Sequence, residues 1–185
     1  MLPIIIVSDN QEYQKNFLAN FLENENIPKI NIQNIISEKA FSITDVRNIG
    51  AIARSALCSG AQALIIPDKG VGALNEEALK SSAGALEQIQ VCRVNSLLKA
   101  VDTLHLNGFQ VFTSEMRAEK NVFELNFTLP TCIIMGAEGK GVQAHLAKAA
   151  DYFFKIPMAG NFNSFNVSVA TGIILYEALK QRQFS

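Results

Sequence analysis

The segment IIMGAEGKGVQ (residues 133–143) passes directly from three apolar residues into a loop that holds three glycines. A short apolar run that stops at a glycine is typical of a buried strand followed by a turn. Glycine adopts positive φ angles and lets a ligand or another backbone approach closely, because it has no Cβ. The segment therefore predicts a strand over 131–136 and a ligand-binding loop after it. A tight strand-to-helix turn without any ligand would leave the same pattern.

The glycine spacing excludes the two common phosphate-binding loops. A Walker loop ends in Gly-Lys-Ser or Gly-Lys-Thr, whereas Lys140 is followed here by Gly141. The dinucleotide-binding pattern G-x-G-x-x-G also fails, since the order here is G-x-x-G-x-G. Glu138 adds a carboxylate that would repel a phosphate. We therefore expect a ligand that offers hydroxyl or amine groups.

Strand and helix signals alternate along the chain, which predicts an α/β domain with a mostly parallel sheet flanked by helices. Ligands bind such sheets in the loops after the strands, so the loops after 61–67, 131–136 and 151–158 are the candidates. The predicted strands are 3–9, a segment beginning at Pro28, 61–67, 91–94, 109–115, 131–136 and 151–158. The predicted helices are 11–26, 44–60, 75–88 (one helix, or a helix broken at its weak point, Gly84), 95–108, 142–150 and 166–183.

Length and composition indicate one soluble domain, with or without a small appendage. The 185 residues are 49% hydrophobic and 18% charged, which is an ordinary globular composition. The chain has no apolar run long enough to span a membrane and no basic segment before its first apolar run. We therefore expect a cytoplasmic protein without a membrane partner. The net charge of −1 does not indicate nucleic-acid binding, although a local basic patch can lie within a neutral total.

The cysteines and histidines give no metal-binding pattern. Cys58, Cys92 and Cys132 are far apart in the chain and no pair has C-x-x-C spacing, which predicts free thiols in a reducing compartment. His105 and His145 each stand alone in a predicted helix. We therefore expect no metal ion.

Two further segments combine polar side chains with an element end. In RNIGAIAR (47–54), Arg54 lies at the edge of the apolar face made by Ile49 and Ile52, where it could be partly buried, although a lone arginine at such a position is more often a surface charge. The segment IPMAGNFNSFNVSVA (156–170) passes from a strand end through a polar loop into a helix. Ser164 and Asn166 are residue types that cap helices, which is their ordinary structural role.

Three ordered segments resemble the sequence motifs of the SpoU family of RNA 2′-O-ribose methyltransferases, the TrmH class of the SPOUT superfamily. They are NIGAIARSALCSGAQALIIP (48–67), IIMGAEGKGV (133–142) and IPMAGNFNSFNVSVATGIILYEALKQR (156–182). The resemblance is nearest to the branch that methylates a guanosine in 23S rRNA, with the tRNA-methylating branch close behind. It implies a C-terminal trefoil knot, S-adenosylmethionine as cofactor, an RNA substrate and a homodimer whose active site lies near the subunit interface.

The resemblance also implies roles for particular residues. Arg54 would stabilise the attacking ribose oxygen electrostatically or remove its proton, although an arginine is a reluctant base. Ile156 and Met158 would flank the adenine of the cofactor. The implied catalytic residues are Arg54, Asn48, Glu138, Ser164 and Asn166, and the implied cofactor-binding residues are Met135, Gly136, Glu138, Gly139, Gly141, Ile156, Met158 and Phe165.

The chain departs from the family pattern in two places. Phe165 stands where relatives usually have leucine, and the strand expected just before the first motif is reduced to AFSI (40–43). We expect a methyltransferase domain over 41–185 and a short β-α-β segment over 1–40. That segment is either the remnant of an RNA-binding domain or an insertion after the first strand. A non-catalytic RNA-binding or assembly protein remains the alternative function, and a nucleotide-binding protein is disfavoured by the failed phosphate-loop patterns.

Overall fold

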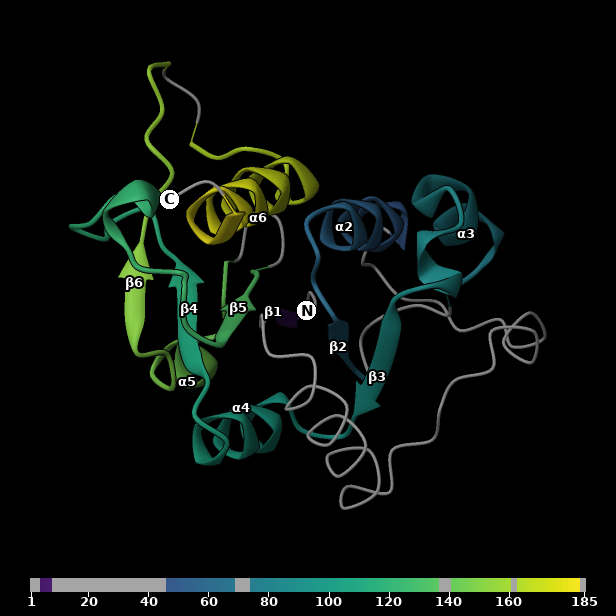
Figure 1. Ribbon diagram of the computed structural model, residues 1–185, viewed down its shortest axis with the longest axis horizontal. Coiled ribbons are helices and arrows are strands. Elements are labelled where there is room, and N and C mark those ends of the chain that lie inside the picture. Colours follow the sequence, from purple (N-terminus) through teal and green to yellow (C-terminus); the bar gives the residue numbers. More distant parts are fainter. Residues whose placement is uncertain (1–3, 8–45, 69–73, 137–140, 161–162, 184–185) are drawn as a thin grey trace.

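A computed structural model of the protein has six strands in one sheet, with helices on both faces (Figure 1). The structure describes residues 4–7, 46–68, 74–136, 141–160 and 163–183. Its elements in chain order are β1 (Ile4–Val7), α2 (Val46–Cys58), β2 (Ala63–Pro67), α3 (Glu76–Ser82), η2 (Ala85–Glu87), β3 (Gln90–Val94), α4 (Leu97–Leu106), β4 (Gln110–Ser114), η3 (Val122–Glu124), β5 (Thr131–Ile134), α5 (Ala144–Ala147), β6 (Tyr152–Phe154) and α6 (Val167–Gln183).

The sheet has the strand order β3-β2-β1-β5-β4-β6. Strand β1 lies in the middle and runs antiparallel to both of its neighbours, β2 and β5. All other neighbouring pairs are parallel. The prediction of a mostly parallel sheet is therefore confirmed. The carboxyl ends of β4, β5 and β6, which are consecutive neighbours in the sheet, meet at one edge.

Helices cover both faces of the sheet, which explains why β2 and β5 are buried along their whole length. Figure 1 shows α2, α3 and α6 on one face and α4 and α5 on the other. The first face packs around Ile49, Ile52, Leu64, Phe112 and Phe154. The second face packs a separate set of apolar side chains, including Ile65, Val101, Leu104, Val111 and Leu146.

Helix α2 lies unusually close to α3. A Cβ built on Gly50 would lie 2.2 Å from the carbonyl oxygen of Ala78 and 2.0 Å from the hydroxyl of Ser81. The predicted break near Gly84 is confirmed, because α3 ends at Ser82 and both Ala83 (φ 48°) and Gly84 (φ 85°) are left-handed. The short helix η2 follows at once, so the chain turns back toward β3.

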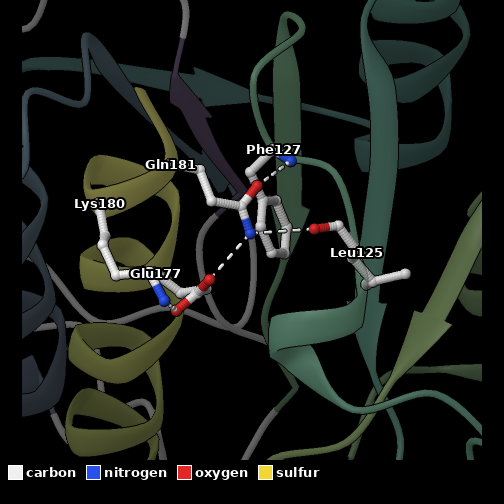
Figure 2. A network of polar contacts seen from close by, with 5 residues as sticks. All are labelled: Leu125, Phe127, Glu177, Lys180 and Gln181. Carbon is white, nitrogen blue, oxygen red and sulfur yellow. Dashed lines mark hydrogen bonds and ion pairs between the residues drawn. The ribbon is translucent and has the colours of Figure 1, made fainter. Parts of the chain in front are cut away.

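The last turns of α6 hold the loop that precedes β5 (Figure 2). The side-chain oxygen of Gln181 accepts the N–H of Phe127 at 2.8 Å, and its nitrogen donates to the carbonyl of Leu125 at 3.0 Å. Arg182 Nε donates to the carbonyl of Phe127 at 2.7 Å. Buried backbone groups need such partners when no strand supplies them. Phe127 is fully buried and packs on rings from β4 and β6, namely Phe112 and Phe154.

Two predicted elements are shorter than expected. The strand predicted over 151–158 ends at Phe154, because the next residue, Lys155, pairs instead with the segment at 120–122, and Pro157 has no N–H to donate. The helix predicted over 142–150 covers only Ala144–Ala147. The predicted helix 11–26, the strand from Pro28 and the first two residues of the helix predicted over 44–60 lie outside the described residues. None of the described helices is long and apolar enough to cross a membrane.

Candidate functional site

A cavity of about 1100 Å³ lies at the edge of the sheet where β4, β5 and β6 end. Its walls come from the loops that follow these three strands and from the start of α6. This is the position at which parallel α/β sheets bind ligands, because the loops after neighbouring strands converge there. Two of the three loops predicted from the sequence, those after β5 and β6, therefore belong to one site.

Most of the cofactor-binding residues implied by the family resemblance line this cavity. Met158 is 37% exposed and Phe165 is 40% exposed, so the cavity presents apolar surface that a ligand could cover. Glu138 and Gly139 lie outside the described residues. The implied residues that line the cavity are Met135, Gly136, Gly141, Ile156, Met158 and Phe165, and the implied catalytic residue Ser164 lines it as well.

Gly136 is required by the loop itself. A Cβ at this position would lie 2.4 Å from the carbonyl carbon of Gly141 and 2.6 Å from the nitrogen of Val142. Gly141 has φ of 65°, a left-handed conformation that favours glycine. The chain therefore leaves β5 and returns directly against Gly136. The sequence predicted that this glycine leaves room for a ligand. The structure adds a more direct reason, because two backbone segments contact each other at this position.

Asn166 connects the starts of α6 and α2. Its side-chain oxygen accepts the N–H of Ser168 at 2.9 Å and the Ser168 hydroxyl at 2.6 Å, as an N-cap does. Its Nδ2 donates to Oδ1 of Asn48 at 3.2 Å. The predicted capping role of Asn166 is confirmed. The bond to Asn48 also brings two of the implied catalytic residues together beside the cavity.

Replacing Asn166 with alanine should lower the free energy of unfolding by about 1–2 kcal/mol, because both the cap and the bond to Asn48 are lost. Asn166→Asp is the matched variant, since aspartate caps as well as asparagine but cannot donate to Asn48. Urea unfolding of the three proteins should place Asn166→Asp between the other two. Equal stability of Asn166→Ala and the wild type would show that the cap contributes nothing.

Arg54 lies on the surface, which is one of the two placements that the sequence left open. It is exposed and is not among the residues that line the cavity. It is not partly buried, because α2 turns Ile49, Ile52, Ala53 and Ala56 toward the core and Arg54 away from it. Helices α2 and α6 run side by side in the same direction, with Ser55 close to Gly172 and Asn48 bonded to Asn166. Arg54 therefore projects from the surface of this helix pair.

Sequence reasoning missed the third wall of the cavity, which is the segment after β4. Thr113, Ser114, Glu115, Met116 and Arg117 line it. The signal was a run of polar residues at the end of a predicted strand. It became interpretable only once β4 was known to lie between β5 and β6.

On the α4 side of the sheet, the side chains of the titratable residues His105 and Asp151 contact each other. His105 Nε2 lies 3.0 Å from Oδ2 of Asp151, and that oxygen also accepts the N–H of Val111 at 2.7 Å. Burial raises the pKa of the Cys92 thiol to about 11 and raises the pKa of Cys132 further, so both are inert thiols. All three cysteines are free. Within the described residues, no three His, Cys, Asp or Glu side chains are placed to hold a metal ion.

A mostly parallel sheet with a glycine-bordered cavity at its carboxyl edge defines a cofactor-binding α/β domain. The model of the SpoU rRNA methylase family matches residues 40–176, and the chain belongs to this family. The 23S rRNA (guanosine-2′-O-)-methyltransferase RlmB of Pseudomonas aeruginosa is 36% identical over 177 residues, which are 95% of this chain and 68% of that protein. RlmB of Pseudomonas syringae pv. tomato is 41% identical over 140 residues, which are 76% of this chain and 56% of that protein.

Solved structures of the same family have the same fold. The SpoU methyltransferase AviRb from Streptomyces viridochromogenes superposes with a TM-score of 0.71 at 32% identity, covering 75% of this chain and 56% of that chain. The A. aeolicus TrmH/SpoU tRNA-modifying enzyme gives a TM-score of 0.70 at 25% identity, covering 93% of this chain and 85% of that one. The chain spans 56–68% of the length of the two RlmB proteins.

Proposed function

We propose that the protein transfers a methyl group from S-adenosylmethionine to a ribose 2′-hydroxyl of RNA, and that the acceptor is a guanosine in 23S rRNA. The observation that carries this proposal is the convergence of the implied cofactor residues on one cavity at the carboxyl ends of β4, β5 and β6. The RlmB relatives act on a guanosine of 23S rRNA, as their names state. A structure of AviRb in complex with AdoMet, at 29% identity to this chain, supports the cofactor assignment.

The residues of the cavity fit this cofactor. Met135, Ile156 and Met158 offer apolar surface for an adenine, and Gly136 lines the cavity while Gly141 and Val142 pack against it where a side chain would be. The carboxylate of Glu115 suits the amine and hydroxyl groups of the cofactor. When bound, S-adenosylmethionine supplies an electrophilic methyl group on a positively charged sulfur. The protein must then hold the ribose in line with that methyl and exclude water.

The ribose hydroxyl is a weak nucleophile until its proton is removed or its developing charge is stabilised. We propose that Arg54 stabilises this oxygen, because a guanidinium stays protonated and is poorly suited to accept a proton. Ser164, which lines the cavity, and the bonded pair Asn48 and Asn166 would orient the acceptor. For Glu138 we propose the polar role that the resemblance implies. Since Arg54 projects away from the cavity of its own chain, we propose that it acts in the cavity of a second subunit.

We therefore propose a homodimer that buries the exposed face of α6. Val169 is 50% exposed and Tyr176 is 61% exposed, although they lie two turns apart on one side of a helix whose other side is in the core. Two apolar residues at this spacing suit contact with a second copy of the same helix, and α2 with Arg54 lies directly beside them.

Val169→Glu should convert the dimer to a monomer in analytical ultracentrifugation and remove methyl transfer, because a carboxylate would be buried without a partner. Leu106→Glu is the control, since Leu106 is 87% exposed on α4 at the other face of the sheet. A dimeric Val169→Glu protein with full activity would contradict the proposed interface.

We also propose the C-terminal trefoil knot that the family resemblance implies. The match to the SpoU family model over residues 40–176 supports this proposal. For the domain organisation, we propose that Ile4–Val7 belongs to the methyltransferase domain over 41–185. The central place of β1 in the sheet supports an insertion after the first strand over a remnant domain.

We place the activity in the cytoplasm, where the ribosomal RNA is.

Transfer of labelled methyl groups to RNA lacking 2′-O-methylation tests the function. Purified protein should label one ribose of 23S rRNA transcribed in vitro, and the labelled nucleotide should be a guanosine. A tRNA pool is the second acceptor to include, because the A. aeolicus tRNA-modifying enzyme matches this chain over 85% of its own length. Binding of the cofactor without transfer to either RNA would favour the non-catalytic alternative.

A further inference from the structure

The charge of the cavity differs in sign from the charge of the chain. Arg117, Lys155 and Glu115 are the charged side chains among the described residues that line it, so two cations and one carboxylate give a net charge of +1. The whole chain has a net charge of −1. A neutral or acidic protein that concentrates positive charge in a cleft attracts anions to that cleft.

Backbone pairing brings Arg117 and Lys155 to one rim, although they are far apart in the sequence. The N–H of Glu115 donates to the carbonyl of Phe154 at 2.8 Å, which continues the β4–β6 pairing one residue beyond the end of β4. On the other side of β6, the N–H of Lys155 donates to the carbonyl of Lys120 at 2.9 Å, and Lys155 accepts the N–H of Val122 at 2.9 Å. The segment 115–122 therefore wraps around the end of β6.

Neither cation forms an ion pair within the part of the chain that the structure describes. The ion pairs found there join Lys80 to Glu76, His105 to Asp151 and Lys180 to Glu177, and none includes Arg117 or Lys155.

A second carboxylate near Lys155, that of Glu124, does not line the cavity and bonds to Asn121. Glu124 Oε2 accepts the N–H of Asn121 at 2.6 Å and its Nδ2 at 2.7 Å. These two bonds hold the pKa of Glu124 below its usual value, and the positive charges of Lys120 and Lys155 add to that effect. The Glu124 carboxylate therefore has its own hydrogen-bond partners, and the cations face the cavity.

We propose that Arg117 and Lys155 form an anion site that holds a backbone phosphate of the acceptor RNA at the mouth of the cavity. The proposal rests on the proposed function. The 2′-oxygen and the 3′-phosphate are attached to neighbouring carbons of one ribose, so a cavity that receives the hydroxyl must accommodate a phosphate beside it. The planar guanidinium of Arg117 can donate two parallel hydrogen bonds to a phosphate, and Lys155 contributes a point charge.

An anion of the cofactor is the other source of the same chemistry. S-adenosylmethionine carries one carboxylate, and a cation pair on the cavity rim could bind it. The exposure of Arg117 favours RNA, because the side chain stands at the mouth of the cavity where a polymer can reach it. The two sources are separable, since only the RNA phosphate contributes a salt-dependent release of counterions from a polyanion.

The test compares the wild type with Arg117→Ala, Lys155→Ala and Lys99→Ala. The control residue, Lys99, is an exposed cation on α4, across the sheet from the cavity. Fluorescence anisotropy of a labelled 12-nucleotide oligouridylate, measured from 50 to 300 mM KCl, gives the dependence of affinity on salt. Each cavity variant should lower the log–log slope by about 0.7, which at 0.15 M salt weakens binding by about fourfold. Lys99→Ala should leave the slope unchanged.

Calorimetry with S-adenosylmethionine supplies the second arm. Cofactor affinity should stay at the wild-type value in both cavity variants. Weaker cofactor binding with an unchanged RNA slope would assign the anion to the cofactor carboxylate and overturn the proposal, as would no change in either measurement. Arg117→Lys should recover part of the slope that Arg117→Ala loses, if that loss comes from the missing charge and not from misfolding. If the wild type methylates rRNA and both cavity variants keep the full slope, the proposed function stands and the proposed anion site is refuted.

Discussion

Arg54→Ala should lower kcat for methyl transfer to RNA by a factor of about 10²–10³ and leave the dissociation constant of S-adenosylmethionine within about twofold of the wild type. The loss is that of one preorganised positive charge near an oxygen that becomes negative during the reaction. Cofactor binding should survive because Arg54 is exposed and does not line the cavity of its own chain. Single-turnover transfer of labelled methyl groups, at saturating cofactor, measures the chemical step.

Two controls separate this role from general surface charge. Arg54→Lys keeps the charge but loses the planar fork, so it should recover part of the rate if the role is electrostatic. Lys80→Ala removes a cation that is paired with Glu76 on the surface of α3, and it should transfer methyl groups at the wild-type rate. Wild-type turnover by Arg54→Ala would remove this residue from the mechanism. Equal loss of cofactor affinity would instead place Arg54 in the cofactor site.

The fold class was predictable from the sequence because it depends on local signals. Alternating apolar runs and helical periodicities gave the elements between residues 44 and 183, and the break at Gly84 followed from one residue type. The order of strands in the sheet was not predictable, because pairing between β1, β2 and β5 joins segments that are distant in the chain. For the same reason the sequence did not show that the segment after β4 borders the cavity.

The candidate site was predictable where a backbone requirement marks the sequence. Gly136 and Asn166 stand out because glycine and a capping residue at element ends have few substitutes, and both lie where expected. Arg54 shows the limit of such reasoning. Helical spacing gives the direction of Arg54 around the axis of α2 relative to Ile49 and Ile52. Whether another helix or another chain covers Arg54 is decided by packing between helices or between chains.

Gly136→Ala should weaken the binding of S-adenosylmethionine by about 5–150-fold, which is the effect of 1–3 kcal/mol of overpacking on the bound conformation of the loop. The added Cβ would lie 2.4 Å from the carbonyl carbon of Gly141 and 2.6 Å from the nitrogen of Val142. These are backbone atoms, so no side chain can rotate away and the loop itself must move. Gly136→Val should be at least as damaging, since it adds two methyl groups at the same place.

Gly172→Ala is the matched glycine variant. Its Cβ would meet the Ser55 hydroxyl at 3.7 Å, an ordinary contact, and it replaces a glycine inside helix α6. It should keep wild-type cofactor affinity and be about 0.5–1 kcal/mol more stable. Calorimetry measures the affinities, and thermal unfolding shows whether Gly136→Ala is still folded at the assay temperature. Wild-type affinity in folded Gly136→Ala would mean that the loop shape is irrelevant to the cofactor.

Arg54→Ala and Gly136→Ala, combined in one dimer, show whether Arg54 acts in the cavity of its own subunit or in that of its partner. In a mixed dimer, one subunit carries Arg54→Ala with an intact cofactor loop, and the other carries Gly136→Ala with an intact arginine. If Arg54 acts in the cavity of the partner subunit, the mixed dimer has one complete site, and its activity at a cofactor concentration near the wild-type dissociation constant exceeds that of either parent. If Arg54 acts in its own cavity, neither site is complete and activity stays within the range of the two parents. Return of activity on mixing would therefore support both the subunit arrangement and the role of Arg54.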